Sequence, residues 1–266
     1  SNGSDPGTPP EATTYHYDLL GRMDFTELPN GVVEDYSFDE LDRLFTLRHL
    51  QSDGNNTDLS DNPVRDIFDY IYGDDGKLTE MTETISTSTP VTSHYEWNYD
   101  DAGRLISEAI DSTDNTLDQT ESYRLDLAGN RIQRSVDKPG TANDFTDVYT
   151  YDSNDRLQTE TRHPNLDATG TPVNTTTYSW NETQQTEKAV VSSSGSSVTQ
   201  SMAYGLTGQP ERIVTETRDA ANNVVGRTQV EYRYDSSGVR FLAIDSSDGD
   251  LGTATIERVE GGRTEY

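Results

Sequence analysis

The chain contains no cysteine and only four histidines among its 266 residues. Without cysteine it has no disulfide, no thiolate nucleophile and no zinc–thiolate site. It also lacks any apolar run of about 18 residues, and its first residues lack the basic and apolar regions of a signal peptide. The sequence therefore predicts no thiol chemistry and no insertion into a membrane.

Cations are scarce: 20 Lys and Arg stand against 48 Asp and Glu, giving a formal net charge of −28. Such a charge repels phosphates, so we expect no nucleic-acid partner. Hydrophobic residues make up only 30% of the chain, which approaches the composition of disordered proteins. Against disorder, the 15 Tyr, 6 Phe and 2 Trp are placed in pairs two residues apart. This spacing indicates β-strands with one aromatic face.

The aromatic pairs belong to a phrase that recurs along the chain. Seven clear copies are "YHYDLLGRM" from Tyr15, "YSFDELDRL" from Tyr36, "YIYGDDGKL" from Tyr70, "YEWNYDDAGRL" from Tyr95, "YRLDLAGNRI" from Tyr123, "YTYDSNDRL" from Tyr149 and "YRYDSSGVRF" from Tyr232. Two weaker copies, "YSWNETQQ" from Tyr178 and "MAYGLTGQP" from Met202, keep the aromatic residue and the polar turn but lose the Arg-Leu restart. One repeating architecture therefore accounts for nearly the whole chain.

Each copy has an anchor residue at the start of its turn. The anchors are Asp18, Asp39, Gly73, Asp100, Asp126, Asp152, Asn181, Gly205 and Asp235. An Asp at this place accepts hydrogen bonds from backbone N–H groups just ahead, and a Gly three residues later suits the end of a type I turn. Asp42 and Asp155 replace that Gly in two copies and tolerate a positive φ less well.

A basic residue usually follows the turn, just before the second strand, as in Arg22 and Arg104. An exposed ion pair with the turn Asp is expected to contribute little, about 0–1 kcal/mol. Coverage of a neighbouring ring by the Arg stem is expected to matter more.

Polar loops of unequal length separate the copies, which explains a period that varies from 21 to 34 residues. The repeating unit is predicted to be two strands of about 6–9 residues joined by the fixed turn. Thr, Val, Tyr and Ser dominate between the turns and favour strands over helices. We therefore predict an all-β fold with essentially no helix, a flexible leader at residues 1–14 and a single array of about nine hairpins at residues 15–266.

The repeated phrase resembles that of the YD-repeat, or Rhs (rearrangement hotspot), family. That family includes polymorphic bacterial toxins, toxin-complex C components, wall-associated proteins and teneurins. The resemblance implies that tandem β-hairpins form one long, curved antiparallel sheet, as an open spiral or partial shell. It gives an architectural role to the residues that match the motif. These are Tyr15, Tyr17, Asp18, Gly21, Arg22, Tyr36, Phe38, Asp39, Arg43, Trp97, Tyr99, Asp100, Gly103, Arg104, Leu125, Asp126, Gly129, Tyr149, Tyr151, Asp152, Arg156, Tyr232, Tyr234, Asp235 and Gly238.

Signals of catalysis are poor. The four histidines, His16, His49, His94 and His163, form no metal-binding pattern, and no nucleophile elbow or P-loop occurs. The family's core signature for self-cleavage is also missing, so we expect neither enzymatic activity nor self-processing. No cofactor is expected. Calcium has two candidate loops, Asp53 to Asp61 and Asp245 to Asp250, although neither has the EF-hand register and ordinary turns explain both.

Three functions remain open. The first is a non-catalytic structural scaffold, a segment of a β-sheet shell on a secreted or cell-surface bacterial protein. The second is a binding module for glycans or a cell-surface protein, although rings that recur at one strand position suit contacts within the sheet better than sugar stacking. The third is an encapsulating segment of an Rhs-type toxin. Open sheet edges predict pairing with the rest of a longer parent protein or self-association.

Overall fold

The computed structural model describes residues 12–54, 58–247 and 255–258, with side chains up to Arg240. These residues form 19 β-strands and no helix, which confirms the predicted all-β class. None of the described residues therefore builds a helix that could cross a membrane. The expected leader at residues 1–14 lies outside the described part up to residue 11, and the first strand begins at Thr14.

The chain divides into two compact units, residues 1–121 and 122–266. The first unit contains β1 (Thr14–Tyr17), β2 (Met23–Glu27), β3 (Val32–Phe38), β4 (Leu44–Gln51), β5 (Val64–Tyr72), β6 (Leu78–Ile85), β7 (Val91–Tyr99) and β8 (Leu105–Ser112). The boundary between the units falls inside β9 (Gln119–Leu125).

The second unit contains β10 (Arg131–Asp137), β11 (Phe145–Tyr151), β12 (Leu157–His163), β13 (Asn174–Trp180), β14 (Gln185–Ser192), β15 (Ser197–Tyr204), β16 (Pro210–Arg218), β17 (Val224–Tyr234), β18 (Arg240–Ser247) and β19 (Thr255–Arg258).

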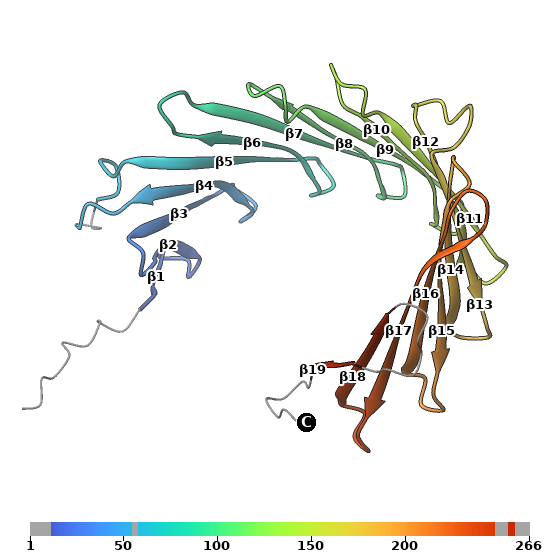
Figure 1. Ribbon diagram of the computed structural model, residues 1–266. Coiled ribbons are helices and arrows are strands. Elements are labelled where there is room, and N and C mark those ends of the chain that lie inside the picture. Colours follow the sequence, from blue (N-terminus) through green and yellow to red (C-terminus); the bar gives the residue numbers. More distant parts are fainter. Residues whose placement is uncertain (1–11, 55–57, 248–254, 259–266) are drawn as a thin grey trace, which may run out of the picture. The chain divides into compact units, whose positions relative to one another are not determined.

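Within each unit the strands lie side by side in chain order as a single twisted layer (Figure 1). From β1 to β8, and again from β10 to β19, each strand pairs antiparallel with the next. In the described part of the chain, β1 pairs only with β2 and β19 only with β18. Each is therefore an open edge strand.

A tight turn closes each of the nine hairpins at its anchor. In eight of them the anchor N–H donates to the carbonyl of the residue four positions later, as Asp100 does to Arg104 at 2.9 Å. The turn at Asn181 is one residue shorter and closes on Gln184. A residue with positive φ follows in the longer turns, so each is a three-residue hairpin loop with a bulge.

Few side chains are buried, because a single layer of strands has no second layer to cover it. The buried hydrophobic residues of the described chain are Val33, Leu50, Val136 and Tyr149. Val33 lies directly opposite Leu50 on adjacent strands, so even this small core is made by cross-strand pairs. Contacts between neighbouring strands and turns must therefore supply most of the stability.

Candidate functional site: the repeated turn edge

One carboxylate organises each of the six turns that have an Asp anchor. Asp100 Oδ1 accepts from the backbone N–H groups of Ala102 and Arg104 at 3.0 and 2.9 Å, and its Oδ2 accepts from Nε of Arg104 at 2.7 Å. Asp18, Asp39 and Asp152 make the same three kinds of contact with their own turns. The N–H bonds expected from the sequence are thus present, and the basic residue after the turn completes the set.

These bonds fix the charge of the turn carboxylates. The backbone N–H of Arg104, together with its guanidinium, lowers the pKa of Asp100 below its ordinary value. The pKa of Asp152 is lowered by the side chain and then by the backbone N–H of Arg156. At neutral pH these carboxylates are ionised and already accept several hydrogen bonds, so they are poorly suited to serve as general acids.

The turn also needs one residue with positive φ. Gly103 has a φ of 76°, and the matching Gly21, Gly129 and Gly238 also lie in this region. Asp42 and Asp155, which replace Gly in two copies, adopt φ values of 61° and 58°. The backbone geometry of the turn is therefore the same whether or not glycine supplies it.

The basic residue of one hairpin lies over a ring of the following hairpin. The Cζ atom of Arg22 is 4.7 Å from the ring centroid of Phe38, and that of Arg43 is 4.5 Å from Tyr72. Arg156 lies over Trp180 at 5.5 Å. The ring coverage expected from the sequence is thus made by the guanidinium itself and joins two repeats.

A second contact between repeats is the ring-to-carbonyl bond, which sequence reasoning missed. The aromatic residue directly before the anchor donates its polar hydrogen to the preceding hairpin, where the carbonyl of the first residue of the second strand accepts it. Six such bonds measure 2.7–2.9 Å: Tyr72 to Leu44, Tyr99 to Leu78, Tyr151 to Arg131, Trp180 to Leu157, Tyr204 to Gln185 and Tyr234 to Pro210. The available signal was a Tyr or Trp at this position, where Phe38 and Leu125 have no donor.

Neighbouring hairpins meet in one constant register. The residue four positions before an anchor lies opposite the residue seven positions after the preceding anchor, as Asp69 opposite Thr46 and Glu96 opposite Glu80. The same offset recurs at Phe25–Asp35, Gln133–Val148, Thr159–Thr177 and Arg212–Glu231. After the shorter turn at Asn181 the offset is one residue less, with Glu187 opposite Ser201. Loops of very different length thus do not alter how repeats join.

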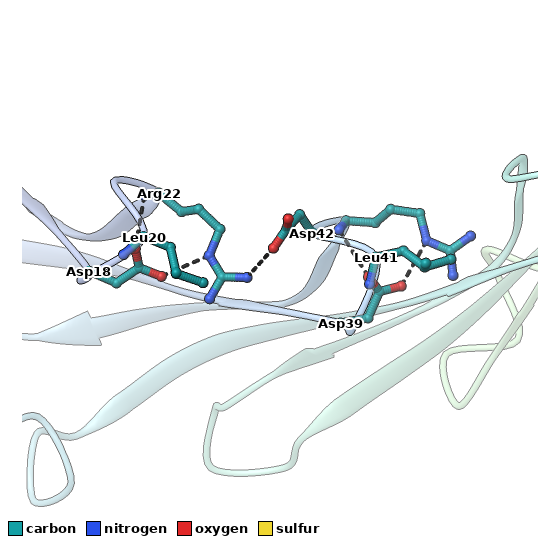
Figure 2. A network of polar contacts seen from close by, with 7 residues as sticks. Asp18, Leu20, Arg22, Asp39, Leu41 and Asp42 are labelled. Atoms are coloured by element: carbon teal, nitrogen blue, oxygen red, sulfur yellow. Dashed lines mark hydrogen bonds and ion pairs between the residues drawn. The ribbon is translucent and has the colours of Figure 1, made fainter.

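Side chains also connect successive turns. Arg22 holds Asp18 of its own turn and reaches Asp42 of the next turn with its Nη1 atom, at 2.6 Å from Oδ1 (Figure 2). In the weaker copies Gln184 donates to the carbonyl of Gly208 at 3.0 Å, and Gln209 to that of Gly238 at 2.9 Å. Copies that have lost the Arg therefore keep the link with an amide.

The first ring of each pair has varied surroundings. Tyr149 is 7% exposed, whereas Tyr15 is 56% exposed on the edge strand. Tyr36 donates to Glu34, and Tyr232 lies under Arg240. Ring-to-ring stacking is sparse in the described chain, with Tyr95 and Trp97 as the one stacked pair between repeat aromatics. The aromatic rings thus contact cations and polar groups more than one another.

A buried ion pair is a further feature that the sequence did not reveal. The Asp147 side chain is 1% exposed, and both its oxygens accept from Arg162 on the next strand, at 2.8 and 2.9 Å. Arg134 on the other neighbouring strand lies 3.8 Å from Oδ2, and both guanidiniums face the ring of Phe145. With 48 acidic residues in the chain, nothing local distinguishes Asp147; only strand register selects it.

Three of the histidines lie beside carboxylates on strands of the first unit. His16 contacts Glu27 at 3.0 Å, His49 contacts Asp66 at 3.1 Å and His94 lies 3.6 Å from Glu80. Nδ1 of His163 is buried without a hydrogen-bond partner among the described residues. No group of three or more potential metal ligands occurs within the described ranges.

The calcium candidates lie partly outside the described residues, at 55–57 and 248–250. In the first loop, Asp58 Oδ1 accepts from the backbone N–H of Ser60 at 2.9 Å, an ordinary turn contact.

No family model and no curated protein matches the chain. Among solved structures, a TcdB2-TccC3 crystal structure is 12% identical with a TM-score of 0.49, over 91% of this chain and 15% of that one. A Photorhabdus luminescens Tc holotoxin pore is 13% identical with a TM-score of 0.42, over 90% and 13% of the two chains. A porin-like protein from Bacteroides uniformis is 10% identical with a TM-score of 0.35, over 84% and 90%. Likenesses this weak decide neither family nor function, and the toxin chains are several times longer than this one.

Proposed function

We propose that this chain is a non-catalytic structural scaffold, a segment of a β-sheet shell on a secreted or cell-surface bacterial protein. The observation that carries the proposal is the constant register between hairpins, held by the ring-to-carbonyl bonds and by the cations over the rings. Each repeat thus supplies the ring that binds the preceding repeat. It also supplies the carbonyl and the cation that contact the ring of the following repeat. Such a unit is suited to extending a sheet, because one isolated hairpin is marginal and stacking supplies its buried face.

The turn edge supports a structural role over catalysis. Its carboxylates are ionised and engaged with their own turns, and the rings lie against cations or donate to carbonyls. Rings held in this way offer little free face for stacking on a sugar. The net charge of −28 keeps an extended surface in solution and repels nucleic acid.

Limited proteolysis of the intact chain, beside a screen of glycans and cell-surface proteins, tests the scaffold. Interlocked hairpins predict early cleavage only in the long loops between them, such as residues 138–144 and 164–173, and no saturable ligand at high protein concentration. Saturable binding by the folded chain, lost on unfolding, would instead support the binding-module alternative.

One feature favours that alternative, a groove across β14 to β17. Its lining contains Thr199, Ser201, Arg212, Arg218 and Arg227 beside the carboxylates Glu187 and Glu216. Glu216 is paired with Arg218, and neither Arg212 nor Arg227 has an ion-pair partner among the described residues. Three guanidiniums against two carboxylates leave this lining with a small net positive charge, which suits an acidic glycan. Titration with a uronic-acid oligosaccharide tests this: the Arg212→Ala and Arg227→Ala variants should lose binding, whereas Arg233→Ala, outside the groove, should retain it.

The encapsulating toxin segment is the third candidate. It predicts that the parent gene continues into a variable cytotoxic region, which reading the coding sequence beyond Tyr266 would test directly.

A further inference from the structure

At the outer edge of β1, Tyr17 occupies the position of the rings that form ring-to-carbonyl bonds. No described residue supplies a carbonyl for it. Tyr17 directly precedes the anchor Asp18, the position from which six other rings donate to the preceding hairpin. Tyr17 and Tyr15 are 60% and 56% exposed, and neither hydroxyl has a hydrogen-bond partner among the described residues. The two rings thus face solvent in an arrangement that is covered elsewhere in the protein.

The backbone of this edge is also available. Thr14 to Tyr17 pair with β2 on one side, and no described strand pairs with them on the other. The constant register gives the missing pairing, because Thr14 lies four residues before its anchor. It would face the residue seven positions after the anchor of an incoming hairpin, as Glu96 faces Glu80.

We propose that the β1 edge is a docking site for one further β-hairpin of the same repeat type, supplied by another polypeptide segment. The proposal rests on the scaffold function above and deepens it by naming the partner. The incoming hairpin has a tight turn followed by Arg or Lys. Its cation covers the ring of Tyr17, its first strand carbonyl after the turn accepts the Tyr17 hydroxyl, and its second strand pairs with β1.

A second copy of this chain fits the edge less well than a hairpin from elsewhere. The second strand of its last hairpin, β18, is already paired with β19 from Ala243 to Asp245. Two β1 edges meeting each other would bring Tyr17 no cation and no turn carbonyl. Two whole chains would also bring together two net charges of −28.

The chain itself contains a suitable probe, Phe145 to His163. In its native place this hairpin puts Arg156 over Trp180 and accepts the indole N–H on the carbonyl of Leu157. A second copy of these residues, fused ahead of Ser1, would be tethered to β1 by residues 1–13 at an effective concentration of roughly millimolar. Because the chain has no cysteine, two introduced thiols report the register without competition.

The test combines Thr14→Cys with Thr159→Cys in the tethered copy, since Thr159 lies opposite the residue four before the next anchor in the native pairing. Directly opposed residues satisfy disulfide geometry, so this pair should crosslink at least about tenfold faster than a control with Gln158→Cys in the copy, whose side chain points to the other face. Tyr17→Phe should slow the in-register crosslink about threefold to tenfold, the value of one hydrogen bond.

Equal crosslinking rates for the two pairs would overturn the proposal. A faster disulfide between two molecules of untethered Thr14→Cys would also overturn it, and would assign the edge to a second copy. Failure of the scaffold itself is seen separately in the thermal unfolding of Tyr99→Phe, which tests a contact inside the first unit and does not involve β1.

Discussion

At the residue scale, the anchor Asp in six of the nine turns accepts hydrogen bonds from backbone donors that the bend removes from strand pairing. Asp39 accepts from the N–H groups of Leu41 and Arg43 and from the Arg43 side chain. The same carboxylate thus fixes the bend and positions the cation that covers Tyr72 in the next hairpin. Local turn chemistry and the joining of repeats are therefore coupled through a single residue.

Gly103→Ala is predicted to destabilise the first unit in two ways. A positive φ costs a non-glycine residue about 1 kcal/mol, and the new Cβ would lie 2.8 Å from Cε of Lys77, which covers Tyr99. Lys77 can move the end of its flexible side chain aside and loses its cover of Tyr99, so denaturant unfolding should show a loss about 0.5 kcal/mol larger than for Gly21→Ala, which has a similar φ of 81° and a Cβ that meets no atom within 4 Å. Equal losses for the two variants would mean that Lys77 over Tyr99 adds nothing to stability.

Arg162→Ala leaves the buried carboxylate of Asp147 without its bidentate partner. Breaking a fully buried pair costs about 3–5 kcal/mol, but the Arg162 side chain is 37% exposed, so we expect about 2 kcal/mol after allowing for solvent screening. The matched control is Arg48→Ala, whose partner Asp35 is 17% exposed and should lose less. Urea unfolding of both variants measures the difference, and a stability equal to wild type for Arg162→Ala would contradict the assignment.

At the scale of elements, the ring-to-carbonyl bond is the contact that recurs between hairpins regardless of loop length. It joins Tyr234 to Pro210 and Tyr72 to Leu44 in the same way, although different loops separate these hairpins. Where the ring has a donor, this polar contact beside the turn supports the register, because a slip by one residue would move every side chain to the opposite face. The hairpin of Phe38 keeps the same offset with Arg22 over its ring and no such bond.

Tyr99→Phe removes one such bond and nothing else. We expect a loss of about 1 kcal/mol, because the carbonyl of Leu78 loses its donor at 2.9 Å. Tyr17→Phe is the matched control, since the Tyr17 hydroxyl has no partner among the described residues and its loss should leave stability unchanged. Thermal unfolding followed by circular dichroism compares the two, and equal effects would count against the bond.

At the scale of the whole molecule, the ionised turn carboxylates make the stability depend on pH. The turn carboxylates have lowered pKa values because each accepts bonds from its own turn, as Asp39 does from the N–H of Arg43 and Asp235 from Ser237. Groups of this kind stabilise the fold fully above the unfolded pKa of about 3.9, and the stabilisation is lost as the pH falls through the lower folded values.

Stability is therefore predicted to decline below about pH 4. Chemical unfolding measured at steps between pH 6 and pH 2.5 should show this decline in the free energy of unfolding. The decline should be smaller in Asp100→Asn, because its side chain cannot be protonated. A midpoint that stays constant down to pH 2.5 would show that the turn carboxylates contribute nothing to stability.

Much of this architecture could be predicted from the sequence because its determinants are local. The anchors Asp18, Asp100 and Asp235 bend the chain through contacts with residues at most four positions away, so the repeated phrase identifies the turns directly. The ring-to-carbonyl bond could not be predicted, since Tyr72 and Leu44 are 28 residues apart and the loop between them has no fixed length. The buried ion pair of Asp147 could not be predicted for the same reason, because its partners lie on two other strands.

The sequence by itself determined the strands, the nine turns and the acidic character of this protein, because those follow from contacts within one hairpin and from composition. Only the tertiary structure decided which carbonyl each ring binds, which carboxylate is buried and which edge is left open. Those depend on how one hairpin pairs with the next, and strand register brings together residues that variable loops keep apart along the chain.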